Sequence, residues 1–132
     1  MDDAFDSAKR AIVLVIDDTP ENLALMSELL SEQYEVKVAN NGRRGLRIAA
    51  SDMPPDLILL DIMMPEMDGY EVCKALKTNA QTCGIPVIFM TALDSSENAQ
   101  RSLELGAIDY IAKPIDPSAM LERIGSYLAL RP

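Results

Sequence analysis

The stretch LILLDIMMPEMDGY, residues 57–70, sets one carboxylate, Asp61, among seven apolar neighbours. A charged group buried in apolar surroundings is strongly destabilising unless it is paired or hydrogen-bonded. Asp61 must therefore lie where the chain leaves the core, or beside a compensating group from elsewhere in the fold. Residues 57–60 have the continuous apolar character of a buried strand. We therefore predict a central strand that ends at Asp61, with its compensation coming from other strand ends.

Five short apolar runs recur along the chain, and each predicts a strand: residues 11–16, 34–39, 56–60, 86–90 and 107–112. The first, third and fourth runs are nearly continuous in apolar residues, as expected for strands that helices cover on both faces. The second run alternates, since Val36 and Val38 are separated by the charged Lys37. This pattern suits a strand at the edge of the sheet.

Helical patterns follow these strands, at residues 20–32, 43–51, 68–78, 95–105 and 117–130. The first helix opens with Thr19 and Pro20, a plausible cap followed by proline. Leu23, Met26 and Leu30 then form one apolar stripe. Strands that alternate with helices imply right-handed crossovers and a parallel sheet with helices on both faces. We therefore predict one α/β domain.

The overall composition is that of one globular domain with an acidic surface. The chain has 132 residues, 48% of them hydrophobic and 25% charged, and a net charge of −9. This charge argues against binding to the phosphate backbone of a nucleic acid. No apolar run approaches the roughly 20 residues of a membrane span, and residues 1–10 lack the apolar segment of a secretory signal. We expect a cytoplasmic protein with a polar extension, 1–10, before a single domain, 11–130.

The chain contains no histidine. This removes the nucleophile pairs that depend on histidine and all histidine-based zinc sites. Cys73 and Cys83 lie ten residues apart, in neither a metal nor a redox spacing, and we interpret them as ordinary reduced thiols. A metal ion bound by this chain should therefore be a hard, oxygen-ligated cation such as Mg²⁺ or Ca²⁺.

Polar residues stand at the carboxyl ends of the predicted strands. Asp17 and Asp18 follow the first strand, Asp61 the third, Thr91 the fourth and Lys113 the fifth. In a parallel sheet these ends share one edge, where α/β proteins bind ligands. Carboxylates about 4 Å apart repel by roughly 4 kcal/mol a pair at an effective dielectric near 20, so a divalent cation would relieve them better than lysine alone. The pattern predicts an Mg²⁺-assisted phosphoryl site with an aspartate nucleophile.

These residues together resemble the receiver domain of two-component response regulators. The resemblance rests on Asp17-Asp18, Asp61 with a proline–Gly69 loop, Thr91-Ala92, Tyr110 and Lys113-Pro114. They occur in the family's order and spacing, and although no one of them is decisive, five together are highly specific. The resemblance implies a flavodoxin-like, doubly wound fold with strand order 2-1-3-4-5. It also implies a signalling phosphoacceptor rather than an enzyme.

The resemblance assigns a role to each residue of the site. Asp61 would accept a phosphoryl group from the phosphohistidine of a sensor histidine kinase or a histidine-phosphotransfer protein. Asp18, Asp61 and the backbone carbonyl of Met63 would hold Mg²⁺, and Asp17 would support it through water. Lys113 would pair with Asp61 and then with a phosphoryl oxygen. The domain would support its own Mg²⁺-dependent phosphotransfer and autodephosphorylation.

The resemblance also implies a switch. Thr91 would hydrogen-bond the phosphoryl group and Tyr110 would change rotamer, while the Lys113–Pro114 peptide bond is expected to be cis. The signal would reach a surface formed by the fourth helix, the fifth strand and the fifth helix. That surface would bind an output domain, a downstream protein or a second copy of the chain.

The two helices of this surface differ in how much they can bury. The fourth helix offers little beyond Ala99, Leu103 and Leu105, so it should dock weakly and shift most on phosphorylation. The fifth helix should stay anchored by its apolar residues, which are Met120, Leu121, Ile124 and Leu128.

Three other functions fit the sequence less well. An aspartate-nucleophile phosphatase would need a second aspartate two residues after Asp61, where this chain has Met63. A flavin carrier shares the strand–helix architecture, but carboxylates at Asp17 and Asp18 would repel a flavin phosphate. A phosphorylation-independent, receiver-like scaffold is disfavoured because the whole acidic and basic set is present. The sequence identifies neither the kinase nor the stimulus nor the output.

Overall fold

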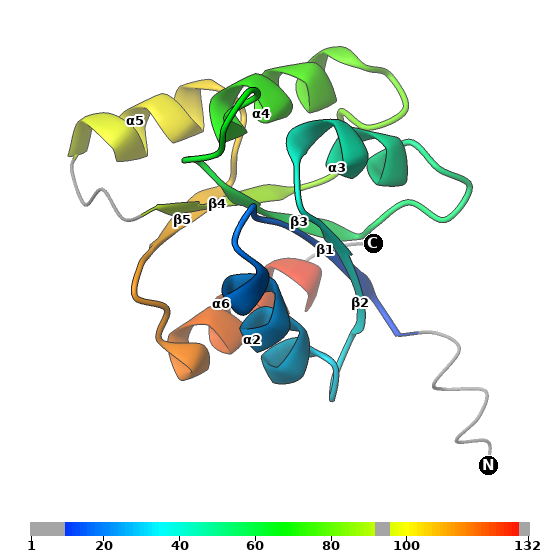
Figure 1. The fold of residues 1–132 in the computed structure, drawn as a ribbon, viewed down its shortest axis with the longest axis vertical. Coiled ribbons are helices and arrows are strands. Elements are labelled where there is room, and N and C mark those ends of the chain that lie inside the picture. The colour runs from blue at the N-terminus through cyan, green and yellow to red at the C-terminus, as the bar shows by residue number, and fades with distance from the viewer. Residues whose placement is uncertain (1–9, 92–95, 130–132) are drawn as a thin grey trace.

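A five-stranded sheet forms the centre of the computed structural model, which describes residues 10–91 and 96–129. Every strand pair is parallel, and the strand order is β2-β1-β3-β4-β5. This confirms the predicted order, with the strand that carries Asp61 in the middle (Figure 1). The strands are β1 (Ile12–Ile16), β2 (Glu35–Ala39), β3 (Leu57–Asp61), β4 (Val87–Thr91) and β5 (Asp109–Ala112).

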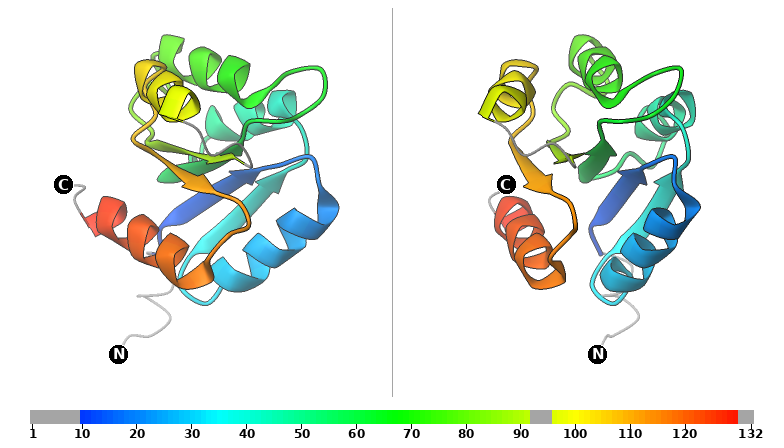
Figure 2. Two further views of the ribbon diagram at one scale, coloured as in Figure 1. Left: turned by 90° about the vertical axis from the view of Figure 1, so that its left-hand side faces the viewer. Right: turned by 60° about the vertical axis from the view of Figure 1, so that its left-hand side comes forward.

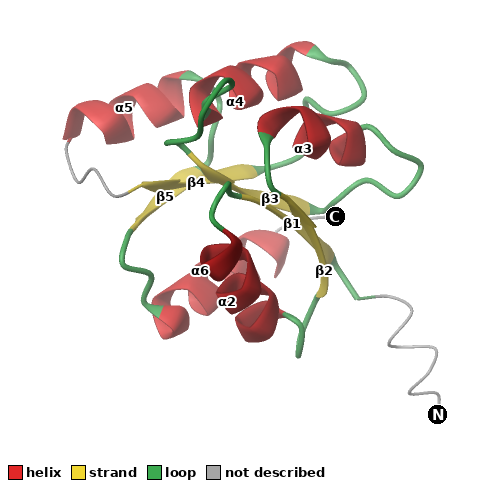
Figure 3. Cartoon of the chain, in the orientation of Figure 1, coloured by secondary structure: helices red, strands yellow, loops and turns green. Residues whose placement is uncertain are grey.

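Helices cover both faces of the sheet, as predicted. Helices α3, α4 and α5 lie on one face, and α2 and α6 on the other (Figures 1 and 2). Strand and helix alternate along the chain (Figure 3). None of the helices in the described ranges is long and apolar enough to cross a membrane. The helices are α2 (Pro20–Leu30), α3 (Gly42–Ala49), α4 (Gly69–Thr78), α5 (Ser96–Glu104) and α6 (Pro117–Ala129).

Each face of the sheet carries its own hydrophobic core, because successive strand residues point to opposite faces. Leu14 and Ile16 of β1 belong to the core shared with α3 and α4, whereas Val13 and Val15 belong to the core shared with α2 and α6. All residues of β1, β3 and β4 are buried. This explains why β1 is apolar throughout and why β3 and β4 are apolar up to their last residue.

Strand β2 lies at the edge of the sheet, as predicted, but its side chains do not divide into one buried and one exposed face. Val38 is 41% exposed, and Val36 is only half-buried. Lys37 is also half-buried, and its Nζ donates to the Met53 carbonyl at 2.8 Å. The apolar–polar alternation therefore does not correspond to a buried and an exposed face, because an edge strand is only partly covered by the helices above and below it.

The starts of two helices show different capping. Helix α4 has a capping box, in which Asp68 Oδ1 accepts the Glu71 N–H at 2.9 Å and Glu71 Oε1 accepts the Asp68 N–H at 3.0 Å. Helix α2 begins at Pro20, as predicted, but within the described residues the Thr19 side chain makes no capping hydrogen bond. The Thr19 N–H instead donates to Asp17 Oδ1 at 2.9 Å. The start of α2 is thereby tied to the residue that follows β1.

Helix α5 buries only part of the apolar set predicted for it, since Leu105 packs against the core whereas Leu103 does not. Ser102 is 1% exposed, whereas Leu103 is 54% exposed, so the expected burial of Leu103 is wrong. A helix with so few apolar residues has no strong stripe to set its rotation. The side chain of Ala99 lies outside the described part of the structure. Helix α6 is anchored as predicted, by the buried Met120 and Ile124.

Candidate functional site

The carboxyl ends of four strands bring polar side chains to one edge of the sheet. Asp17 follows β1, Asp61 is the last residue of β3, Thr91 is the last residue of β4, and Lys113 follows β5. Asp17, Asp61 and Thr91 are buried, each no more than 3% exposed. The structure therefore brings together side chains that are up to 96 positions apart in the sequence.

Asp17, Asp18 and Asp61 form an acidic cluster. One carboxylate oxygen from each residue lies within 4.8 Å of the other two. Like charges at such distances repel one another unless cations lie between them. Grouped carboxylate oxygens are the ligands that Mg²⁺ and Ca²⁺ prefer. The cluster therefore fits a hard divalent cation.

Lys113 is the cation that the fold places at this cluster. Its Nζ lies 3.1 Å from Asp61 Oδ1 and 3.5 Å from Asp17 Oδ2. The Lys113 side chain is 22% exposed, whereas those of Asp17 and Asp61 are almost fully buried. One ammonium is thus shared between two buried carboxylates, which leaves the cluster with excess negative charge.

Asp17 is held at both carboxylate oxygens. Oδ1 accepts the Thr19 N–H at 2.9 Å, and Oδ2 accepts the Asn22 side-chain amide at 3.3 Å as well as the more distant Lys113. Sequence reasoning missed Asn22. Its only signal in the sequence is its position in the first turn of the helix after Asp17. Whether a side chain there reaches back depends on the angle between α2 and the sheet.

The pKa of the Asp61 carboxyl is raised above its ordinary value. The largest cause is burial, and the negative charge of Asp17 adds to it. The hydrogen bond and charge of Lys113 and a hydrogen bond with the Met63 backbone lower the pKa again, without cancelling the increase. The folded protein therefore holds Asp61 in surroundings that disfavour its charged form, despite the contact with Lys113.

The loop after Asp61 is closed against the strand end by Gly69. The Gly69 N–H donates to the Ile62 carbonyl at 2.9 Å, and a β-carbon on Gly69 would lie 2.3 Å from the Asp61 carbonyl oxygen. Only glycine fits so close to the strand. Ile62 and Met64 are buried in the core, whereas the Met63 side chain between them is 62% exposed. Core packing therefore accounts for two of the three apolar residues that follow Asp61.

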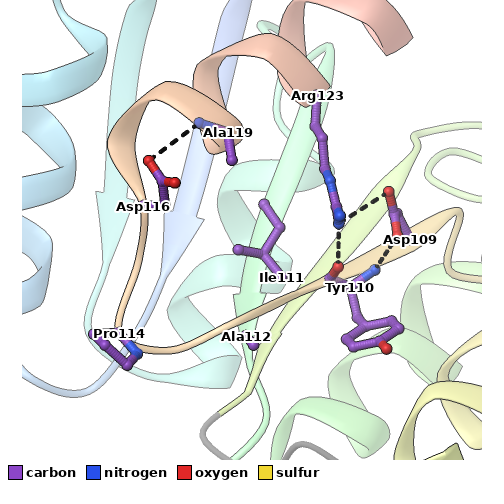
Figure 4. A pocket seen from close by; sticks show the side chains of 8 residues that line it. All are labelled: Asp109, Tyr110, Ile111, Ala112, Pro114, Asp116, Ala119 and Arg123. Atoms are coloured by element: carbon purple, nitrogen blue, oxygen red, sulfur yellow. Dashed lines mark hydrogen bonds and ion pairs between the residues drawn. The ribbon is translucent and has the colours of Figure 1, made fainter.

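Thr91 and Tyr110 lie on neighbouring strands. Thr91 is buried at the end of β4, and its carbonyl accepts the Lys113 N–H at 2.8 Å. Tyr110 pairs with Phe89 across the sheet and packs, half-buried, against the core beneath α4. In Figure 4 the Tyr110 ring lies on the opposite side of the β5 ribbon from Arg123. The two residues expected to switch thus lie on neighbouring strands, β4 and β5, two positions apart in the register.

Three further expectations concern the ends of these segments. The Lys113–Pro114 peptide bond is cis in the structure. Ala92, which follows Thr91 in the resemblance, lies outside the described residues, as do residues 1–9 of the expected extension.

Two of the hollows in the described part of the structure are lined by residues of or next to β5. One, of about 280 Å³, runs along β5 and the start of α6 (Figure 4). In it, the Tyr110 N–H donates to Asp109 Oδ1 and the Tyr110 carbonyl accepts from Arg123 Nη1, each at 2.7 Å. The other, of about 250 Å³, is the one that reaches the acidic cluster. Its lining residues are Asp17, Asn22, Leu25, Met26, Met90, Lys113, Pro114 and Ile115.

The fold and the site together define a doubly wound α/β domain with an acidic cluster and a lysine at the carboxyl edge of its sheet. A family model for the response regulator receiver domain matches residues 13–125. The chain belongs to this family, and it is a receiver domain of response regulators.

The chain is similar to receiver segments of longer proteins. It is 42% identical over 125 residues to a probable cyclic di-GMP phosphodiesterase of Vibrio cholerae, and 45% identical over 117 residues to response regulator PleD of Caulobacter vibrioides. These matches cover 95% and 88% of this chain but only 28% and 26% of those proteins. The chain therefore spans about a quarter of the length of these relatives.

A solved structure supports the same assignment. The chemotaxis protein CheY4 of Vibrio cholerae superposes with a TM-score of 0.83 at 31% identity, covering 89% of this chain and 98% of that chain. The receiver fold is thus matched over nearly the whole length of both proteins.

Proposed function

We propose that Asp61 is the phosphoacceptor of this receiver domain, and that it takes its phosphoryl group from the phosphohistidine of a sensor histidine kinase or a histidine-phosphotransfer protein. The observation that carries this proposal is the position of Asp61 at the end of the central strand. There it lies 3.1 Å from the Lys113 ammonium and within the acidic cluster of Asp17 and Asp18. The reaction would take place in the cytoplasm.

In the proposed reaction, a carboxylate oxygen of Asp61 attacks the phosphorus atom while the P–N bond to the donor histidine breaks. The electron pair of that bond returns to the imidazole, and an acyl phosphate forms on Asp61. Phosphoryl transfer depends mainly on positioning and on stabilising charge on the transferred oxygens. Lys113, already in contact with Asp61, is placed to bind one of those oxygens.

The acidic cluster is the proposed Mg²⁺ site. Asp18, Asp61 and the Met63 backbone carbonyl would be ligands, and Asp17 would support them through water. The excess negative charge of the cluster and the raised pKa of Asp61 support this proposal, because both call for a further cation. When bound, Mg²⁺ would supply the positive charge that stabilises the transferring phosphoryl group. The same site would support slow hydrolysis of the acyl phosphate by water.

The signal would leave the site through Thr91 and Tyr110. Phosphorylation replaces one negative charge by about two and adds three strong acceptor oxygens. We expect the Thr91 hydroxyl, at the end of the next strand, to donate to one of them and to draw in the loop that follows. Tyr110 would then repack against the core, and the surface of α5, β5 and α6 would change. That surface is the proposed contact for an output domain, a downstream protein or a second copy.

The experiment is phosphorylation by a small phosphodonor, acetyl phosphate, with Mg²⁺ and intact-mass detection. The wild-type protein is expected to gain the mass of one phosphoryl group, and Asp61→Asn to gain none. Asp52→Asn is the matched control, because Asp52 is an exposed carboxylate outside the site, and it should behave as the wild type does. A phosphoryl group on Asp61→Asn, or none on the wild type, would contradict the proposal.

A further inference from the structure

Asn22 is a neutral side chain that the structure bonds to the acidic cluster. Its Nδ2 lies 3.3 Å from Asp17 Oδ2. An ionised carboxylate can only accept hydrogen bonds, so the amide must present its N–H to this oxygen. Asn22 itself is half-buried in the wall of the smaller hollow. It therefore adds a donor beside Asp17 without adding charge.

Asp17 Oδ2 also accepts from Lys113, which is the more distant of its two side-chain donors. Lys113 Nζ lies 3.5 Å from Asp17 Oδ2 but only 3.1 Å from Asp61 Oδ1. A lysine ammonium is a compact charge on a flexible stem, and it follows the strongest nearby negative charge. Once Asp61 carries a phosphoryl group, the ammonium should follow the larger negative charge of the phosphoryl oxygens. Of its two contacts, the longer one to Asp17 is therefore the one that we expect phosphorylation to weaken.

A buried carboxylate that loses a donor is costly to keep ionised and oriented. Asp17 is fully buried, and the donors that the structure gives to its Oδ2 come from the protein, from Asn22 and Lys113. The Thr19 N–H holds the other oxygen, at 2.9 Å. With Asn22 in place, each oxygen of Asp17 keeps one fixed donor whichever way Lys113 turns.

We propose that Asn22 is a positioning residue of the receiver site. Its amide holds the Asp17 carboxylate in the orientation that supports the divalent cation, and it continues to do so when Lys113 turns to the phosphorylated Asp61. The inference rests on the proposed function for the second of these steps, but the first concerns the unphosphorylated protein alone. Groups that orient metal-supporting carboxylates commonly change metal affinity by 10- to 100-fold when they are removed.

The test compares Asn22→Ala and Asn22→Leu with the wild type and with Glu21→Gln. Alanine favours helix, and leucine keeps the branched shape of asparagine without its polar atoms, so at least one variant should retain the fold of α2. Glu21 is the exposed neighbour in the same turn, which makes Glu21→Gln the matched control. Two quantities are measured: Mg²⁺ affinity of the unphosphorylated protein by titration calorimetry, and the Mg²⁺ concentration that gives half the maximal rate of phosphoryl gain from acetyl phosphate.

Both Asn22 variants are expected to bind Mg²⁺ roughly tenfold more weakly than the wild type, and to need correspondingly more Mg²⁺ for half-maximal phosphorylation. Glu21→Gln should match the wild type in both quantities. Asn22 variants that fold and bind Mg²⁺ with wild-type affinity would overturn the inference, even if Asp61 is phosphorylated. If the wild type takes no phosphoryl group, the proposed function fails, and the calorimetric titration still decides the role of Asn22.

Discussion

The Lys113 ammonium lies 3.1 Å from Asp61 Oδ1, at the end of the central strand, and Asp17 shares the same ammonium at 3.5 Å. One positive charge thus serves two buried carboxylates, with Asp18 close by. The protein holds this arrangement at a cost in stability, because burial and the neighbouring Asp17 disfavour the charged form of Asp61 and raise its pKa. Measurements on stability as well as on phosphorylation can therefore test the site.

Asp61→Asn is predicted to stabilise the protein at pH 7 in the absence of Mg²⁺. The folded-state pKa of Asp61 is raised above its ordinary value of 3.8, so ionising Asp61 destabilises the folded state. The penalty is absent below the unfolded pKa and is fully present above the folded pKa. We expect a gain in stability at pH 7 that shrinks as the pH falls toward the ordinary carboxyl value of 3.8, measured by thermal unfolding. A stability gain that grows as the pH falls, or an equal gain for Asp52→Asn, would show that the charge on Asp61 does not destabilise the folded state.

Gly69→Ala is predicted to disturb both the fold and the site. The new methyl group would lie 2.3 Å from the Asp61 carbonyl oxygen and 2.7 Å from Ile62 Cα. Backbone atoms cannot move aside as flexible side chains do, so we expect a loss of about 1–3 kcal/mol in urea unfolding and slower phosphorylation. Gly84→Ala is the control, because a β-carbon on Gly84 meets no described atom within 4 Å. Equal stability of the two variants would show that the strand end and the loop are not packed as described.

The contact between α5 and α4 yields a third prediction. The Arg101 guanidinium lies 4.3 Å from the centroid of the Tyr70 ring, and that ring meets Phe89 edge-on at 5.5 Å. A cation–π contact at such a site is worth about 0.5–1 kcal/mol, so Tyr70→Leu should speed local amide exchange in α5 about two- to fivefold. Tyr70→Phe keeps the ring and should leave this exchange near the wild-type rate. The same increase in both variants would show that the ring face does not hold α5.

Met63 is predicted to control how long the phosphoryl group survives. Its apolar side chain is 62% exposed, two residues after Asp61, and we expect it to lie beside the path of a water that attacks the phosphoryl group. Met63→Asn replaces it by an amide that can orient water, so we expect the phosphoryl group to be lost several-fold faster after the phosphodonor is removed. Met53→Asn, at a methionine that is 57% exposed in another loop, serves as the control. Dephosphorylation rates of Met63→Asn and wild type that agree within error would remove this role.

The positions of Asp61 and Lys113 could be predicted because they depend on topology alone. Strands that alternate with helices form a parallel sheet, and a parallel sheet collects the residues at its strand ends. The sequence marks those ends clearly, since each apolar run of β1, β3 and β4 stops at a polar residue. The order of the strands came from the family resemblance and not from the pattern.

The features that the sequence did not predict depend on how helices and strands pack against one another, and not on their order along the chain. Asn22 reaches Asp17 only because of the way α2 leaves the sheet, which no local pattern specifies. Leu103 is exposed and Ser102 buried because α5 lacks a strong apolar stripe to set its rotation. Val38 remains exposed because an edge strand is incompletely covered. In each case the local sequence preference is weak, so tertiary packing determines where the side chain lies.

The most direct test of the central claim is to locate the phosphoryl group on the chain. Acyl phosphates are reduced by borohydride, which converts a phosphorylated aspartate to homoserine, and peptide mass spectrometry then identifies the residue. After treatment with acetyl phosphate and Mg²⁺, the account predicts homoserine at position 61 and unchanged aspartate at positions 17 and 18. Homoserine at either of those two positions, or phosphorylated protein with an unchanged Asp61, would contradict it.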